Sequence, residues 1–284
     1  MNEAVRYRER FSQRQGTGSL ESTPALAASA VVKPLSLTGL RSAMLSQKVI
    51  PRRERLIFAL DVADMAAARS LIEKLGDSVQ FYKIGLQLFM AGGYYDLLED
   101  LTKDGKKVFV DLKFFDVPET VASAVSQLRG RGAYFASVHA GNDEILRAAV
   151  RARGNTKILA VTVLTSLDQH DLDDLGFKAD INDVVYSRAK RALEVGCDGI
   201  ISSGLEAEQL RGQLGHNFLI VTPGIRPVHN DEIRDDDQKR IATVEEAFEK
   251  GADYIVVGRP IRTAPDPRIA AEDIQARIAK LFAA

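Results

Sequence analysis

Eight short apolar runs recur between residues 56 and 261, and this repetition restricts the possible folds more than any other feature of the chain. Most of the runs are hydrophobic throughout, which is typical of parallel strands that are covered on both faces. Segments with the apolar spacing of amphipathic helices lie between them. The predicted strands span residues 56–62, 81–85, 108–114, 135–140, 158–164, 199–204, 218–225 and 254–261.

The helical segments carry boundary signals as well as apolar periodicity. Asp64 and Thr243 are suitable N-caps, and Asp266 precedes Pro267, a proline at the first helical position. Helices are predicted at residues 65–75, 121–129, 144–153, 184–195, 207–214, 244–250 and 269–282. Eight strand–helix units over about 230 residues predict an α/β fold, a (β/α)8 TIM barrel. A doubly wound open sheet is the alternative, but LDVAD after the first strand lacks the GxGxxG loop typical of that fold.

The first part of the chain differs in composition from the rest. Residues 1–55 hold ten Lys and Arg against four Asp and Glu, so this part is about +6 and the remainder about −7. Apolar periodicity is missing until about Leu35, and no apolar signal-peptide core is present. We predict that residues 1–54 are a disordered extension with a short helix near Leu40–Ser46, and that residues 55–284 form one barrel domain in a cytoplasmic protein.

Composition argues against several classes of function. The net charge of −1 gives no electrostatic case for a nucleic-acid partner, and no apolar run approaches the length of a membrane span. The single cysteine, Cys197, has no histidine or basic residue beside it and is predicted to be a small buried side chain. Without CxxC or HExxH, and with four scattered histidines, a structural zinc site is not expected.

The stretch VFVDLKFFDVPET, residues 108–120, places three charged residues next to a buried strand. Asp111 and Lys113 are two residues apart, so strand alternation predicts that both side chains point to the same side. Asp116 follows just past the strand, and Pro118 suits the first turn of a helix. A structural ion pair is the alternative explanation for this cluster.

Polar side chains recur where most of the predicted strands end, which is the face that carries the active site in (β/α)8 enzymes. They are Asp61, Lys83, Asp111, Lys113, His139, Thr165, Ser166, Arg226 and Arg259. Barrels often bind phosphate after strands seven and eight, where Gly258 allows close approach and two arginines offer bidentate hydrogen bonds. Arg226 also opens a loop, ending at Arg240, that is longer than an ordinary connection. Together these features predict a phosphate site.

The remaining charges indicate the chemistry. Carboxylates interleaved with lysines are a poor magnesium site, because the ammonium groups repel the cation. They favour a network that keeps a lysine protonated as a general acid. A Schiff-base lysine needs a depressed pKa, so an aldolase mechanism fits less well.

Residues 55–262 resemble the orotidine 5′-phosphate decarboxylase family, with matching segments in order: ALDV, YKIG, DLKFFDVPET, VHA, VTVLTS, TPGIRP, DQKR and VGRPI. The resemblance implies a homodimer that converts orotidine 5′-phosphate to UMP and CO2, the last step of de novo UMP synthesis, without metal or organic cofactor. It implies that Lys113 protonates C6 beside Asp111, and that the partner subunit supplies Asp116 and Thr120. The other implied roles are the ribose and charge network for Asp61 and Lys83, the base for Thr165 and Ser166, and the phosphate for Arg226, Gln238, Gly258 and Arg259. His139 is interpreted as a structural, hydrogen-bonded residue.

Two alternatives stay open at this point. Magnesium-dependent sugar-phosphate enzymes, such as hexulose-phosphate synthase and keto-gulonate-phosphate decarboxylase, resemble the chain at DxKxxD. A barrel that binds a phosphorylated ligand without turnover belongs to another class, although five titratable residues in one cluster argue against it.

Overall fold

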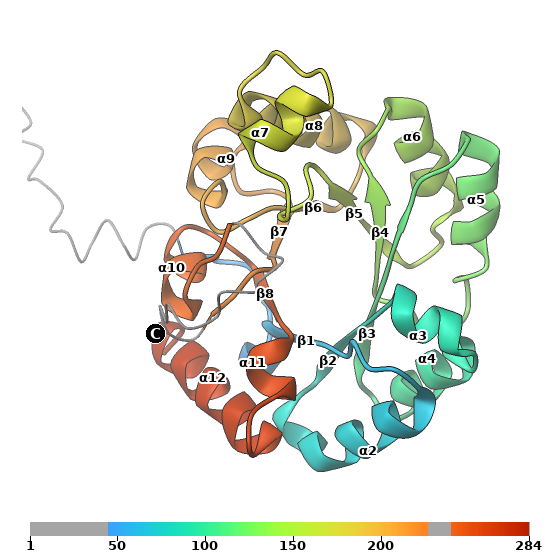
Figure 1. Ribbon diagram of the computed structural model, residues 1–284, viewed down its shortest axis with the longest axis vertical. Helices are drawn as coiled ribbons and strands as arrows, with labels where there is room; N and C mark the ends of the chain where they lie inside the picture. Colours follow the sequence, from blue (N-terminus) through green and yellow to red (C-terminus); the bar gives the residue numbers. More distant parts are fainter. Residues whose placement is uncertain (1–44, 227–239, 284) are drawn as a thin grey trace, which may run out of the picture. The chain divides into compact units, whose positions relative to one another are not determined.

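The eight predicted strands form a closed parallel barrel in the computed structural model, which describes residues 45–226 and 240–283. Each strand pairs with its sequence neighbours, and β8 closes the ring against β1 (Figure 1). The strands are β1 (Leu56–Ala59), β2 (Phe81–Gly85), β3 (Lys107–Phe114), β4 (Phe135–His139), β5 (Lys157–Val161), β6 (Gly199–Ile201), β7 (Leu219–Thr222) and β8 (Tyr254–Val257). The prediction of a (β/α)8 barrel is confirmed.

Helices surround the barrel on the outside (Figure 1). They are α2 (Met65–Leu75), α3 (Leu86–Ala91), α4 (Tyr94–Lys103), α5 (Pro118–Ser126), α6 (Asp143–Ala152), α7 (Gln169–Asp174), α8 (Ile181–Val195), α9 (Ala207–Leu214), α10 (Val244–Glu249), α11 (Arg259–Arg262) and α12 (Pro267–Leu281), with 3-10 turns at Arg52–Glu54 and Gly76–Ser78. The three predicted N-caps are confirmed: the side chains of Asp64, Thr243 and Asp266 each accept a backbone N–H of the first helical turn.

Several predicted boundaries were wrong. Helices α3 and α4 were missed because Gly92 and Gly93, both with positive φ, interrupt their apolar period. The short helix α7 was also missed. Helix α5 begins with Pro118 in its first turn, as predicted, but it ends at Ser126 rather than at residue 129. Strands β1, β5, β6, β7 and β8 end three or four residues before the predicted positions, so polar loops begin deeper in the barrel.

The barrel interior is filled with apolar side chains beneath the site. Phe81, Phe135 and Tyr254 contact one another inside the ring, with ring centroids 5.3–5.8 Å apart. Along β3, Phe109 points into this inner cluster while Val108 and Val110 pack outward against the helices. This alternation directs the next inward position, Asp111, toward the space above the aromatic layer. Cys197 is buried as predicted, and burial raises the pKa of its thiol to about 12.

The described part of the N-terminal segment contacts the lower face of the barrel, where the strands begin. Ser46 and Lys48 donate hydrogen bonds to the Asp253 carboxylate, which lies just before β8. The Arg55 guanidinium donates to the backbone carbonyl of Asp253. Residues 45–54, assigned to the extension from sequence, therefore have specific contacts with the barrel. Residues 1–44, including most of the predicted helix near Leu40–Ser46, lie outside the described residues.

Candidate active site

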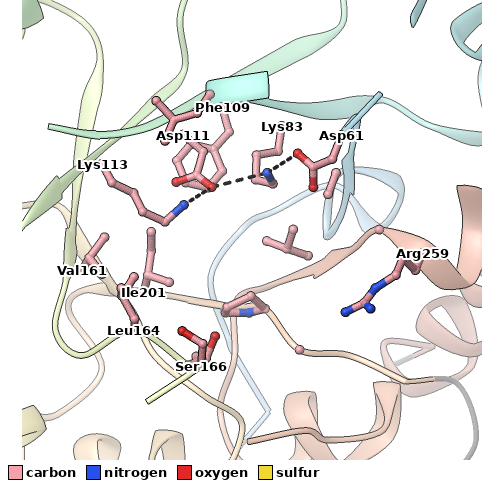
Figure 2. A pocket seen from close by; sticks show the side chains of 18 of the residues that line it. Asp61, Lys83, Phe109, Asp111, Lys113, Val161, Leu164, Ser166, Ile201 and Arg259 are labelled. Carbon is pink, nitrogen blue, oxygen red and sulfur yellow. Dashed lines mark hydrogen bonds and ion pairs between the residues drawn. The ribbon is translucent and has the colours of Figure 1, made fainter. Parts of the chain in front are cut away.

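A cavity of about 620 Å³ opens at the upper face, where the strands end. Nine of the residues predicted from sequence line it, and Figure 2 shows several of them pointing inward from different strands. These nine are Asp61, Lys83, Asp111, Lys113, Thr165, Ser166, Arg226, Gly258 and Arg259. The structure thus brings together side chains that follow the first strand and side chains that follow the last, as the (β/α)8 topology requires.

Two acids and two lysines alternate along one wall of this cavity, and we call these four residues the upper charge cluster. The Lys83 ammonium lies 2.9 Å from an oxygen of Asp61 and 3.4 Å from Oδ2 of Asp111. The same Asp111 oxygen lies 2.8 Å from Nζ of Lys113 (Figure 2). Asp111 is therefore shared by both lysines, and each charge has an opposite charge beside it.

The electrostatics keep Lys83 and Asp111 ionised. Burial alone would lower the pKa of Lys83, but the carboxylates of Asp111 and Asp61 outweigh it and the pKa is raised. Burial would raise the pKa of Asp111, but Lys83, Lys113 and a hydrogen bond from Ser137 outweigh it and the pKa is lowered. A raised pKa at Lys83 agrees with the predicted ion network and is the opposite of what a Schiff-base lysine needs.

Lys113 has an unusual backbone. Among the described non-glycine residues, only Lys113 has a positive φ, at 49°. The pairing of β3 with β4 shifts register between Val110 and Phe114, so β3 bulges where the charged residues lie. A residue in such a conformation costs roughly 1–3 kcal/mol and persists only when its surroundings hold it. Asp111 and Lys113 do face the same side, as predicted, but a bulge rather than plain alternation brings them there.

Ser137 on β4 is the contact that sequence reasoning missed. Its hydroxyl accepts the backbone N–H of Lys113 at 2.9 Å and donates to Oδ1 of Asp111 at 2.8 Å. The signal in the sequence was a hydroxyl inside an otherwise apolar strand, two residues before His139. Gln87 and Arg262 also line the cavity without having been predicted. Arg262 donates to the backbone carbonyl of Asp61, and its signal was its place one helical turn after Arg259.

Arginines lie at the other side of the cavity. Figure 2 shows Arg259, the first residue of α11, across the cavity from Lys113. Arg226, just after β7, is largely buried and donates to the carbonyl of Ile225. A Cβ atom added at Gly258 would lie 3.3 Å from the Cβ of Ala59, so a larger residue would crowd this wall. The cavity therefore has a cationic end suited to a phosphate and an end with alternating charges.

Two of the described predicted residues do not line this cavity within the single chain. Asp116 and Thr120 are exposed and do not line it, and the Asp116 carboxylate accepts the backbone N–H of Val117. Gln238 lies outside the described residues. His139 lies edge-on to Phe115, and burial together with the charges of Lys113 and Arg188 lowers its pKa.

The described residues contain no group of three or more His, Cys, Asp or Glu side chains arranged to hold a metal ion. Across the same residues, no helix combines the length and apolar character needed to span a membrane.

The site offers an ammonium group held by carboxylates, and arginines positioned for an anion. Such an arrangement can bind a phosphorylated ligand and deliver a proton to it.

Comparison with known proteins agrees with this geometry. The chain is 60% identical over 240 residues to orotidine 5′-phosphate decarboxylase of Methylococcus capsulatus, covering 84% of this chain and 98% of the relative. It is 52% identical to the protein of the same name from Rhodopseudomonas palustris, covering 80% and 96%. The crystal structure of orotidine 5′-phosphate decarboxylase from Lactobacillus acidophilus matches with a TM-score of 0.69 and 37% identity, covering 81% of this chain and all of that one. Residues 54–274 also match the model of the orotidine 5′-phosphate decarboxylase / HUMPS family, and the chain therefore belongs to that family.

Proposed function

We propose that the protein releases CO2 from orotidine 5′-phosphate by proton transfer from Lys113 to C6 of the pyrimidine. Decarboxylation of orotidine 5′-phosphate to UMP, in pyrimidine biosynthesis, is supported by the high identity to relatives named orotidine 5′-phosphate decarboxylase, and it makes the chain a carboxy-lyase. In the proposed step the bond between C6 and the carboxylate carbon breaks, and its electron pair stays on C6. A proton of the Lys113 ammonium moves to C6, CO2 leaves, and solvent reprotonates Lys113.

The observation that carries this proposal is the 2.8 Å contact between the Lys113 ammonium and the buried Asp111 carboxylate. Asp111 orients the ammonium group of Lys113. The Asp111 carboxylate stays ionised because the positive charge of Lys83 also stabilises it. A substrate carboxylate placed beside Asp111 is repelled by its charge, and loss of CO2 relieves that repulsion. Proton donor and repelling group therefore act on the same bond.

The remaining cavity residues are proposed to bind the rest of the nucleotide. Arg226, Gly258 and Arg259, together with Gln238, hold the phosphate at the cationic end. Asp61 and Lys83 contact the ribose, and Thr165 with Ser166 faces the base. A phosphate bound so far from C6 supplies binding energy that can be used to stabilise the transition state.

One assay tests the activity. Absorbance change and CO2 release with orotidine 5′-phosphate should be the same before and after EDTA treatment, because no metal takes part in the proposed step. Turnover that disappears with EDTA and returns with Mg²⁺, or turnover only with a pentulose or hexulose phosphate, would contradict the proposal in favour of the sugar-phosphate enzymes. Binding of UMP with no CO2 release would indicate a ligand-binding barrel.

We further propose a homodimer in which each subunit supplies Asp116 and Thr120 to the other's cavity. Supporting this, large apolar side chains flank Asp116 without being covered: Phe115 is 64% exposed and Val117 is 63% exposed. Met90, at the end of α3, is 79% exposed. Such groups favour burial in an interface. The cytoplasmic location stays a prediction from sequence.

Mixing two inactive variants tests the shared sites. Lys113→Ala and Asp116→Asn are each expected to be nearly inactive, but a mixed dimer contains one intact site. Random subunit exchange should restore roughly a quarter of wild-type activity, since half the dimers are mixed and each has one good site in two. A mixture that stays inactive, with exchange confirmed by native mass spectrometry, would show that Asp116 acts within its own chain.

A further inference from the structure

We propose that Ser137 is a positioning residue that sets both the backbone of Lys113 and the carboxylate of Asp111. This inference rests on the proposed roles of those two residues. The Ser137 side chain is fully buried in β4 and lies within hydrogen-bond distance of both. It is therefore placed to join the proton donor and the acid in one rigid unit.

The register shift explains why a hydroxyl is needed here. Where β3 bulges, Lys113 with its positive φ cannot use an ordinary strand pairing, and its N–H is left for another acceptor. Ser137 Oγ accepts that N–H at 2.9 Å. A buried N–H without a partner is strongly unfavourable, so the hydroxyl favours the bulged conformation over a regular strand.

The same hydroxyl also orients the acid. Ser137 donates its only proton to Oδ1 of Asp111 at 2.8 Å, while Oδ2 faces Lys113 and Lys83. One carboxylate oxygen is thus assigned to the serine and the other to the lysines. The contacts close a ring: Lys113 N–H to Ser137, Ser137 to Asp111, and Asp111 to the Lys113 ammonium.

This ring predicts a specific kinetic consequence. Ser137 does not line the cavity, so its loss leaves the surfaces proposed to bind phosphate, ribose and base unchanged. Loss of the Ser137 hydroxyl does, however, allow the Asp111 carboxylate to rotate and Lys113 to leave its strained backbone conformation. The effect is therefore expected in kcat rather than in KM, because small displacements at the reacting centre reduce the rate steeply.

The test compares Ser137→Ala with Ser78→Ala. Ser78 is equally buried, donates to the carbonyl of Leu75, and lies in the 3-10 turn before β2, outside the lining of the cavity. Ser137→Ala should lower kcat roughly 10- to 100-fold, with KM and the UMP inhibition constant within about threefold of wild type. Ser78→Ala should lower the thermal unfolding midpoint but leave kcat unchanged.

Ser137→Cys provides the test if the alanine variant does not fold. It nearly keeps the side-chain volume but carries a weaker hydrogen-bonding group, so its kcat should also fall.

Equal kcat values for the Ser137 and Ser78 variants, or parallel losses of kcat and UMP affinity at Ser137, would overturn the inference. A crystal structure of the Ser137 variant gives a readout that needs no turnover. It should show Lys113 outside the positive φ region or the Asp111 carboxylate turned, and unchanged positions for both would also overturn the inference. Failure of the wild type to release CO2 from orotidine 5′-phosphate would instead contradict the proposed function.

Discussion

The barrel carries buried charges at both ends, and the two groups differ in how completely they are satisfied. At the lower face, the fully buried Asp253 carboxylate accepts hydrogen bonds from Arg211, Lys48, Ser46 and the backbone N–H of Ile220. We call Asp253 and its three side-chain donors the lower charge cluster. At the upper face, Asp111 is also buried, though less completely, and Lys113, one of its partners, is one-third exposed to the cavity.

This comparison indicates that buried charge alone does not identify an active site. The lower charge cluster consists of one acceptor surrounded by donors, which joins the N-terminal segment, α9 and β8 and leaves the acid enclosed. The upper charge cluster contains ammonium groups beside open space and a backbone held in a strained conformation. We interpret the first as stabilising and the second as functional, in line with the roles of the two faces of (β/α)8 barrels.

Removing one lysine from each cluster gives the largest expected contrast. Lys113→Ala should lower kcat by about 10³- to 10⁴-fold, because the proposed general acid is lost, with little change in the thermal midpoint. Lys48→Ala should leave kcat within about twofold and lower the midpoint, because Lys48 pairs with Asp253 and neither residue lines the cavity. Steady-state kinetics and differential scanning fluorimetry measure both effects. Comparable kinetic losses in the two variants would remove the distinction between the clusters.

Neutralising Asp253 should produce the largest loss of stability. Asp253→Asn leaves the guanidinium of Arg211, whose side chain is 1% exposed, without its charge partner. Breaking a buried ion pair in this way typically costs about 3–5 kcal/mol in the free energy of unfolding. Urea unfolding measures the loss, and kcat per folded molecule should be unchanged. The control is Asp100→Asn, which removes a surface pair with Arg69 and should cost less than about 1 kcal/mol; equal costs would contradict the stabilising role of the lower cluster.

Truncation sharpens the comparison at a smaller scale. Deleting residues 1–44 should change neither kcat/KM nor stability. Deleting residues 1–50 also removes Ser46 and Lys48, and should lower the free energy of unfolding by about 1–2 kcal/mol through lost hydrogen bonds to Asp253. The kcat/KM value should stay near wild type in both cases, and a tenfold loss would show that the extension contributes to the upper site or to the proposed dimer.

The smallest expected effect concerns pH and Asp111. Its folded-state pKa lies below the unfolded value of about 3.9, so its contribution to stability is present above about pH 4 and is lost as the pH falls through the folded pKa. The difference in unfolding free energy between wild type and Asp111→Asn should therefore narrow between pH 6 and pH 3. Urea titrations at several pH values measure it. A constant difference would mean that Asp111 has the same pKa folded and unfolded.

The sequence by itself determined the architecture and most of the upper site. Strand and helix periods, N-caps such as Asp64, and the spacing within DLKFFDVPET are local properties, and each depends on residues only a few positions apart. Closing eight parallel strands in order then places their last residues around one opening. For that reason the sequence alone predicts that Lys83, Asp111, Lys113 and Arg259 share a cavity.

Only the tertiary structure decided the contacts that depend on register and on long-range packing. Ser137 reaches Lys113 because β3 shifts against β4, and no local pattern encodes which residue of one strand lies opposite the bulge in the next. The contact between Ser46 and Asp253 joins residues 207 positions apart. Helices α3 and α4 were missed for the converse reason: the glycine pair breaks the local apolar period, whereas the two helices pack against β2 and β3. Local spacing sets the elements, whereas the side-chain contacts between them depend on how the elements pack.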